Sequence, residues 1–218
     1  MTEPNGRGAP RFVLALLLAV LLVGAGGAGY ALALHRHQPP ATDSADAGFA
    51  RDMAVHHAQA VLMASIVRDA STDPKIRYLA YDILTSQQGQ LGMMQGWLSD
   101  WGLPARDSSQ PPMAWMHSAP GGHAGHGGGQ AAGLQPGERM PGMATQAEID
   151  RLRSLRGRPA EVLFLRLMIT HHEAGVDMAR AGVARVHRPA VRRLAGAIAE
   201  SQAAEVQAMQ DLLRERGA

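Results

Sequence analysis

The sequence contains no cysteine, which excludes disulfides, thiolate metal sites and cysteine nucleophiles. Any soft metal ligand must therefore be one of its 12 methionines or 10 histidines. An excess of one charge is also missing: the net charge is +2, and the arginines are scattered instead of forming a basic block with aromatic residues between them. The composition therefore predicts no nucleic-acid partner.

Strand-like alternation of apolar and polar residues with period two is absent from every long stretch, which indicates an all-α chain. Apolar residues instead recur at three-and-four spacing in two segments, as in helices with one buried face. In the first segment they are Ile76, Leu79, Ile83, Leu91, Met94 and Leu98; in the second they are Val191, Leu194, Ile198, Val206, Met209 and Leu213.

These two segments belong to an internal duplication, because shifting the sequence by 115 positions aligns two long regions without a gap. The shift pairs Phe49 with Phe164, Met53 with Met168, and both residues of His56-His57 with those of His171-His172. Asp73-Pro74 is a helix start, with Asp as the cap, and Arg188-Pro189 keeps the proline. Each copy thus reads as a helical hairpin, and two hairpins predict a ferritin-like four-helix bundle.

The N-terminus predicts a segment that meets the membrane. Residues 12–34 carry no charge and, as a helix, would span roughly 34 Å, enough to cross a bilayer. The same run also fits a signal peptide, with Ala31-Leu32-Ala33 as the small-residue site, although its length favours an uncleaved anchor. Because Arg7 and Arg11 stay inside, both alternatives place the remainder in the cell envelope outside the cytoplasm.

The predicted organisation has six parts. Residues 1–11 form a cytoplasmic n-region, 12–34 the anchor or signal peptide, and 35–45 a linker. Residues 46–101 are hairpin copy one, 102–145 a flexible linker rich in Gly, His and Met, and 146–218 hairpin copy two, which begins with a short helix. We expect this second linker to be mobile and dispensable for folding.

The stretches FARDMAVHHAQAVLMA and FLRLMITHHEAGVDMA place histidine and methionine on the inward helix face. Met53 and His57 are four residues apart, so a thioether and an imidazole lie one turn from each other, and the following helix offers more donors. This mixture suits copper, as Cu(I) or Cu(II). The candidate ligands are Met53, His56, His57, Met63, Met94, Met168, His171, His172, Met178, Gln202, Glu205 and Met209. Further candidates in the linker are Met113, Met116, His117, His123, His126, Met140 and Met143.

With these residues the sequence resembles the family of bacterial, often secreted helical proteins called domain of unknown function 305. The matching residues are Asp46, Phe49, Met53, His56, His57, Met63, Ile83, Gln87, Met94 and Trp97, and in copy two Glu161, Phe164, Met168, His171, His172, Met178, Ile198, Gln202, Glu205 and Met209. The resemblance implies a ferritin-like bundle and copper binding in the envelope. Two positions depart from the family pattern: Gln90 replaces a glutamate and Leu212 an aromatic residue.

Three functions remain open at this level. The first is a non-catalytic copper-binding protein that sequesters or relays the ion. The second is a structural or interaction bundle whose paired histidines are packed in the core or titrate as a pH switch. The third, a di-metal oxidase, needs Glu-x-x-His pairs that neither hairpin contains. The sequence therefore favours metal binding without catalysis.

Overall fold

The computed structural model describes residues 14, 16–18, 21–27, 38–117, 134 and 138–218. Within these residues every regular element is a helix and no strand occurs, which confirms the predicted all-α class. The elements are α2 (Ala45–Ala70), α3 (Pro74–Asp100), the 3-10 turn η1 (Ala114–Met116), α4 (Gln146–Ser154), α5 (Gly157–Arg185) and α6 (Pro189–Glu215).

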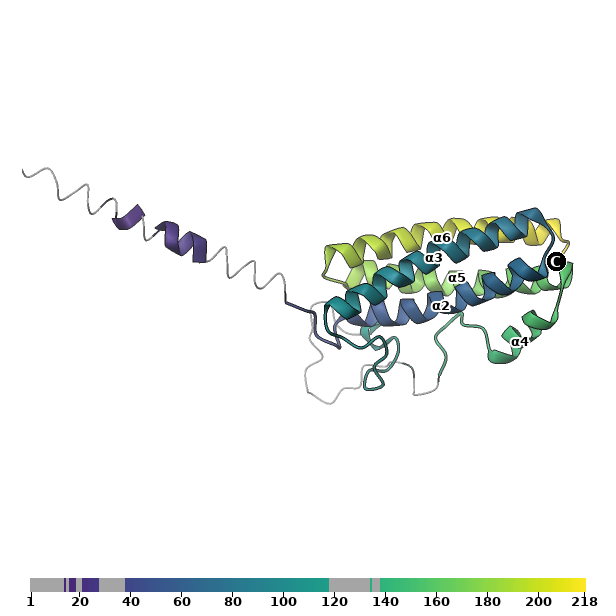
Figure 1. Ribbon diagram of the computed structural model, residues 1–218, viewed down its shortest axis with the longest axis horizontal. Coiled ribbons are helices and arrows are strands. Elements are labelled where there is room, and N and C mark those ends of the chain that lie inside the picture. The colour runs from purple at the N-terminus through teal and green to yellow at the C-terminus, as the bar shows by residue number, and fades with distance from the viewer. Residues whose placement is uncertain (1–13, 15, 19–20, 28–37, 118–133, 135–137) are drawn as a thin grey trace, which may run out of the picture. The chain divides into compact units, whose positions relative to one another are not determined.

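The four long helices form a bundle of two hairpins. Helix α2 packs against α3, α5 packs against α6, and the hairpins meet where α2 contacts α5 (Figure 1). Helix α3 ends and α5 begins at opposite ends of the bundle, so the intervening chain must cross its length (Figure 1). Both η1 and α4 contact α2 and α5, so the described parts of this crossover pack on the α2–α5 face.

Local signals set the helix starts as the sequence predicts. The Asp73 carboxylate accepts a hydrogen bond from the Lys75 backbone at 2.8 Å, and Pro74 takes the first helical position of α3. Thr145 and Glu148 form a reciprocal capping box that starts α4. The predicted short helix before copy two is therefore present.

Each copy also holds a turn of the other through an acidic residue near the start of its first helix. Asp46 accepts hydrogen bonds from the backbone N–H groups of His187 and Arg188, at 3.1 and 2.8 Å. Glu161, 115 positions later, accepts from the Ser71 hydroxyl at 2.6 Å and from Arg216 at 2.9 Å. These buried contacts tie the two hairpins together at both ends.

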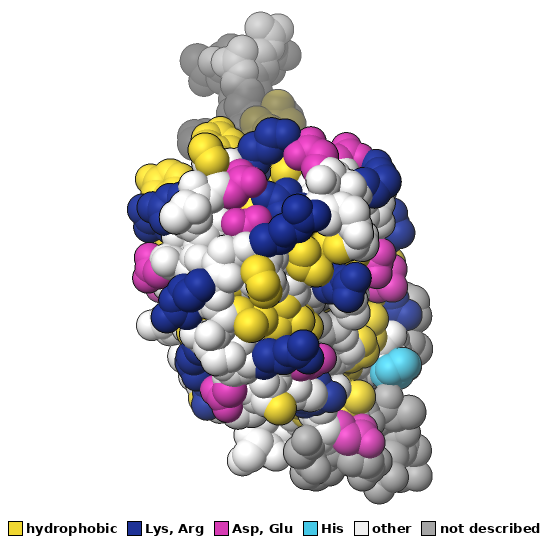
Figure 2. All heavy atoms as spheres, turned by 90° about the vertical axis from the view of Figure 1, so that its right-hand side faces the viewer, with side chains coloured by type: hydrophobic (Ala, Val, Ile, Leu, Met, Phe, Trp, Pro, Cys, Tyr) yellow, Lys and Arg dark blue, Asp and Glu magenta, His cyan; other side chains and the backbone are white. Residues whose placement is uncertain are grey.

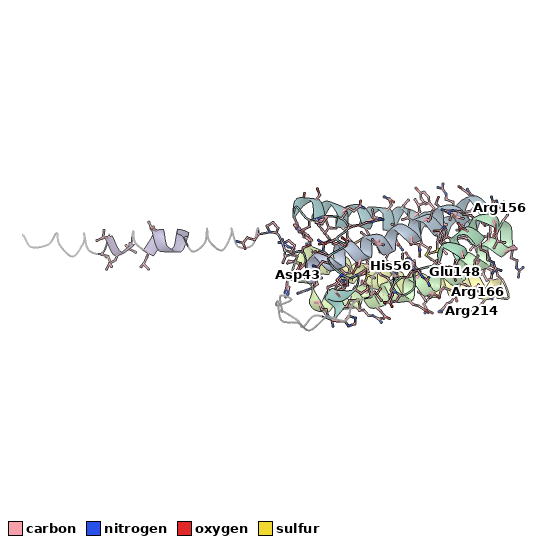
Figure 3. All side chains as sticks on the ribbon, turned by 90° about the horizontal axis from the view of Figure 1, so that it is seen from below. Asp43, His56, Glu148, Arg156, Arg166 and Arg214 are labelled. Carbon is pink, nitrogen blue, oxygen red and sulfur yellow. The ribbon has the colours of Figure 1, made fainter. Side chains whose placement is uncertain are left out.

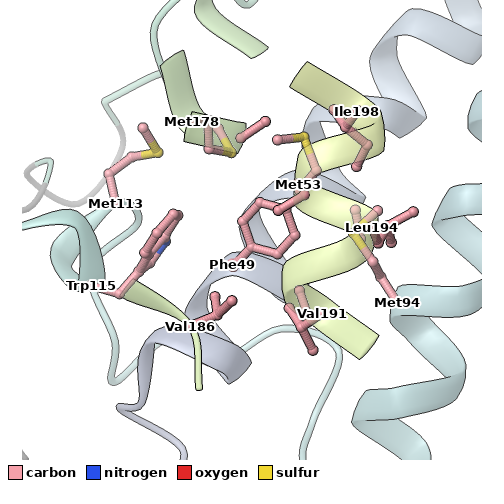
Figure 4. Close-up of a cluster of buried hydrophobic side chains, with 14 of the residues drawn as sticks. Phe49, Met53, Met94, Met113, Trp115, Met178, Val186, Val191, Leu194 and Ile198 are labelled. Atoms are coloured by element: carbon pink, nitrogen blue, oxygen red, sulfur yellow. The ribbon is translucent and has the colours of Figure 1, made fainter. Parts of the chain in front are cut away.

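The core is divided into two hydrophobic clusters. One lies around Phe49 and Trp115, whose rings are nearly perpendicular with their centroids 5.7 Å apart (Figure 4). The other lies around Phe164 and α4. Both phenylalanines are fully buried, as the helical periodicity predicts.

Residues 102–145 are predicted to be a flexible linker, but the described parts of its two ends pack against the bundle. That the linker is dispensable for folding stays a prediction. Trp115 and Met113 are buried against α2, and the Asp52 carboxylate accepts hydrogen bonds from the Trp115 indole and the Met113 backbone, both at 2.8 Å. A side chain at Gly48 would collide with this indole, so glycine leaves the space it needs. Individual anchoring residues therefore pack a segment whose average composition is that of a loop.

The predicted membrane segment is described only in part, since residues 14, 16–18 and 21–27 are helical and the others of 12–34 lie outside the described residues. Among the helices that are described, none combines the length and hydropathy that crossing a bilayer requires.

On the face of the protein shown in Figure 2, basic and acidic side chains are interspersed, with hydrophobic areas between them. This face has no continuous basic surface of the kind that binds nucleic acid.

Candidate metal centre

Four histidines lie between the two hydrophobic clusters. His56 and His57 come from α2, His171 and His172 from α5, and all four have no exposed surface. Figure 3 shows His56 inside the bundle, between its two ends. With Gln87 of α3 and Gln202 of α6, these side chains form what we call the His layer.

Within the layer the two copies meet through His56 and His171. Their ring centroids are 3.6 Å apart with an angle of 31° between the ring planes. Helices α2 and α5 pack against each other, so these two rings meet across the contact between the hairpins. What the sequence missed is that the two rings stack on each other.

The other two histidines are held by the second helix of their own hairpin. His57 Nε2 lies 2.6 Å from Gln90 Oε1, and His172 Nε2 lies 2.7 Å from Glu205 Oε2. Both oxygens only accept hydrogen bonds, so in each pair the Nε2–H is the donor, and the neutral His57 ring keeps a lone pair on Nδ1. A hydrogen bond of this kind orients a metal-binding imidazole and fixes its tautomer.

Many polar atoms of the layer lack a partner. Six buried ring nitrogens have no hydrogen bond: Nδ1 and Nε2 of His56 and His171, and Nδ1 of His57 and His172. Gln87 Oε1 and both amide atoms of Gln202 are also buried without a partner. Each such atom costs about 1–3 kcal/mol, and native cores contain few of them. Nine of them lie together in this one layer.

Burial keeps three of these imidazoles neutral. It lowers the pKa of His56 to about 3, assisted by His57 and His172. It lowers the pKa of His57 to about 4, partly offset by the hydrogen bond to Gln90, and that of His171 well below its ordinary value. A neutral imidazole has the lone pair that a metal requires, so protons do not compete for these rings near pH 7.

The predicted methionine ligands do not gather at one point. Met53, Met94 and Met178 lie in the cluster around Phe49, as Figure 4 shows. The others, Met63, Met168 and Met209, lie in the cluster around Phe164. All six are buried, so thioethers flank the His layer on both sides.

The linker candidates divide in the same way by burial. Met113 and Met140 are buried in the Phe49 cluster, and Met116 and Met143 pack against it while partly exposed. His117 is exposed. His123 and His126 lie outside the described residues.

In the described part of the chain, no three His, Asp or Glu side chains converge on one metal position. Ring rotation or a methionine sulfur would be needed to complete a coordination shell. The donors in and beside the layer are imidazole nitrogens and thioether sulfurs, which suit Cu(I) better than an ion that needs several carboxylates. The donor set of the layer therefore fits copper.

Two features of the layer escaped the sequence reasoning. Gly175 has no side chain where Gln202 enters, and a Cβ there would lie 2.1 Å from Gln202 Oε1. Gln59 holds the backbone of Ala144 beside the layer. The aligned residues are Ala60 for Gly175 and Ala174 for Gln59, but many other aligned positions of the two copies also differ, so the sequence alone does not single out this pair.

The fold and the paired histidines define a duplicated four-helix bundle with a buried His layer. The family model for the domain of unknown function DUF305 matches residues 46–213, and the chain belongs to this family. No curated protein matches the chain.

Solved structures share this fold. A DUF305 protein from Streptomyces coelicolor, described as one expected to be secreted, is 49% identical, covers 82% of this chain and 97% of its own, and gives a TM-score of 0.70. A DUF305 fragment from Deinococcus radiodurans is 33% identical, covers 81% and 99%, and scores 0.61. CopM in its Cu(I)-bound form is 23% identical, covers 78% and 96%, and scores 0.55. At that identity the CopM match shows a common fold.

Proposed function

We propose that this protein binds a soft metal ion, copper foremost, in the His layer, and that it sequesters or relays the ion without catalysis. The single observation that carries the proposal is the set of six buried ring nitrogens without a hydrogen-bond partner. A purely structural core would fill this volume with apolar groups, since each unpaired polar atom lowers stability. A bound ion turns these atoms into ligands.

The roles within the layer follow from its hydrogen bonds. His57 and His172 are the principal ligands, because Gln90 and Glu205 orient their rings through Nε2 and leave each Nδ1 without a hydrogen-bond partner. His56, His171 and the flanking methionines supply further soft donors after side-chain rotation. When bound, copper would supply a charge that this neutral layer can hold through imidazole and thioether ligands.

Copper binding also agrees with what has been crystallised for a protein of the same fold. CopM has been solved with Cu(I), Cu(II) and Ag bound. The low identity means that the ligands cannot be transferred residue by residue, so the assignment here rests on this chain's own histidines and methionines.

We place the bundle outside the cytoplasm, in the cell envelope. The uncharged residues 12–34 after Arg7 and Arg11 support this location, and so does the expected secretion of the Streptomyces relative. The length of the uncharged run further supports a membrane anchor over a cleaved signal peptide.

A di-metal oxidase receives less support from the geometry. Such enzymes project four carboxylates and two histidines into the bundle core. Among the described residues, Glu205 is the one carboxylate hydrogen-bonded to a histidine of the layer. Copy one offers the neutral Gln90 in the same place.

The proposal is tested by metal competition on the purified full chain in detergent. The protein is exposed without oxygen to equal concentrations of Cu(I), Zn(II), Fe(II) and Mn(II), desalted, and its metal content measured. We expect copper to be retained and the other metals to be lost. Retention of zinc, iron or manganese in its place, or of no metal, would overturn the proposal.

A further inference from the structure

A short turn lies across the His layer on the α2–α5 face. Residues 140–144, which we call the strap, form a turn in which the Met143 N–H donates to the Met140 carbonyl at 3.2 Å. Pro141 is its second residue and Gly142, with φ of 76°, its third, as in a type II turn. The Met-Pro-Gly-Met sequence therefore encodes this turn directly.

Two contacts hold the strap closed. The Gln59 side chain of α2 donates to the Ala144 carbonyl at 3.0 Å and accepts from the Ala144 N–H at 2.7 Å. Gly142 lies so close to α5 that a Cβ there would be 2.6 Å from the Ala174 side chain and 2.8 Å from the Thr170 carbonyl. Gln59 and Ala174 are 115 positions apart, so the strap spans the same place in both copies.

The strap covers the stacked rings. The position of a Gly142 Cβ would lie 3.1 Å from the His171 Cα. The Pro141 backbone lies near enough to the His56 ring to raise its pKa, against the larger effect of burial. Gln90 of α3 and Glu205 of α6 hold the neighbouring rings from the second helix of each hairpin.

An ion can reach a fully buried layer only by local opening. Separating two long helices would expose many packed apolar side chains, whereas lifting the strap breaks the Gln59–Ala144 pair and exposes the buried side chains of Met140 and Ala144 alone. Just after the strap, the capping box of Thr145 and Glu148 fixes the start of α4, which provides a fixed point for the movement.

We propose that the strap is a movable cover of the His layer, latched by Gln59, and that it opens to admit the metal ion. The metal in this inference rests on the proposed function; the cover itself does not. Met140 and Met143 lie on either side of Pro141-Gly142, so the cover carries two thioethers at the point of entry.

Two variants weaken the closed state in different ways. Gln59→Ala removes both hydrogen bonds, and Gly142→Ala introduces a Cβ that collides with α5. Gln88→Ala is the control for the first, since Gln88 is an exposed amide on α3. Gly102→Ala is the control for the second, because Gly102 also has a positive φ, 66°, but nothing within 4 Å of its Cβ position.

Opening is measured on the full chain in two ways. Diethyl pyrocarbonate modification at pH 7, followed by peptide mass spectrometry, gives the reaction rates of His56 and His171, with the exposed His187 as reference. Stopped-flow mixing with Ag(I), a soft ion without redox chemistry, gives the rate of metal entry. Loss of two hydrogen bonds should raise both rates on the order of tenfold in Gln59→Ala. Gly142→Ala should raise both rates as well, and both rates of the two control variants should match those of the unaltered protein.

Each outcome decides between the claims. Unchanged modification rates of His56 and His171 in both strap variants would overturn the cover, whatever happens with silver. Faster modification together with faster silver entry supports it in full. If the unaltered protein binds no silver but the variants are modified faster, the cover stands and the proposed function fails. Equal acceleration in the controls would show general loosening and would also overturn the cover.

Discussion

The two copies keep the same packing residues but surround their histidines with different polar groups. Phe49 and Phe164 are equally buried, whereas His57 is held by an amide and His172 by a carboxylate at nearly the same distance, 2.6 and 2.7 Å. The geometry of the duplication is thus retained while its charge is not. The comparison shows that the core determines where the histidines lie, while the substitutions beside them determine which polar group each one meets.

A second group of differences lies on the face that the strap covers. Gln59 of copy one latches the strap, and its counterpart Ala174 only makes room for it. Likewise Gly175 admits the Gln202 side chain where copy one has Ala60. The α2–α5 face under the strap is therefore asymmetric, although the two hairpins that form it are repeats.

Replacing the two buried phenylalanines should break the equivalence of the copies most strongly. Phe49→Ala and Phe164→Ala should each lower the free energy of unfolding by about 3–5 kcal/mol. Phe49→Ala should cost about 1 kcal/mol more, because its ring also makes a T-shaped contact with Trp115. Urea unfolding of both variants measures the difference. An equal or larger loss for Phe164→Ala would contradict it.

Replacing Trp115 tests whether the crossover belongs to the core of the Phe49 end. Trp115→Ala removes a buried indole and its hydrogen bond to Asp52, and should lower stability by about 3–5 kcal/mol. His117→Ala, an exposed neighbour, should stay within about 0.5 kcal/mol of the unaltered protein. Thermal or urea unfolding distinguishes the two. A melting temperature insensitive to Trp115 would restore the idea of a dispensable linker.

Acid should destabilise the metal-free protein through the layer that the two copies share. Unfolded histidines take up protons near pH 6.5, but burial lowers the pKa of His56 to about 3 and of His57 to about 4. The unfolded state therefore binds more protons between these values, and stability must fall as the pH drops from 6.5 towards 3. Unfolding curves across this range measure the fall. In the double variant His56→Ala with His171→Ala the decline should be smaller.

Exchanging the polar partners of the histidines should remove or reverse the chemical difference between the copies. Glu205→Gln removes the negative charge beside His172 but can keep the hydrogen bond, as Gln90 does for His57, and should weaken Cu(II) binding about tenfold, the lower end of the effect of changing a ligand's hydrogen-bonding partner. Gln90→Glu should strengthen it by a similar factor, because copy one then resembles copy two. Cu(II) titration of both variants checks the sign. Two effects in the same direction would show that these positions do not act as equivalents.

The fold was accessible from the sequence because periodicity and duplication are repeated signals. Apolar spacing predicted four helices, and the same spacing turned His57 and His172 inward, where the structure has them fully buried. Asp73 and Pro74 marked a helix start through a single local rule.

The strap and the Trp115 anchor were not accessible in this way. Gln59 and Ala144 are 85 residues apart, and no local pattern announces their contact. Trp115 packs because Gly48 and Asp52 on α2 make room and supply an acceptor, so its burial depends on pairs of distant residues. The average composition of the linker predicts a loop, but it carries no information about contacts between residues that are distant in the sequence.

The account's central claim is that the His layer holds a soft metal ion, and Cu(I) affinity tests it most directly. Competition with a Cu(I) chelator is measured for the full chain and for the double variant His57→Ala with His172→Ala, with circular dichroism as the check on helicity. We predict that the variant keeps its helicity but binds Cu(I) more than about 100-fold more weakly, beyond the loss expected when only a ligand's hydrogen-bonding partner is removed. Unaltered affinity in a folded variant would mean that these histidines only pack the core, and would contradict the account.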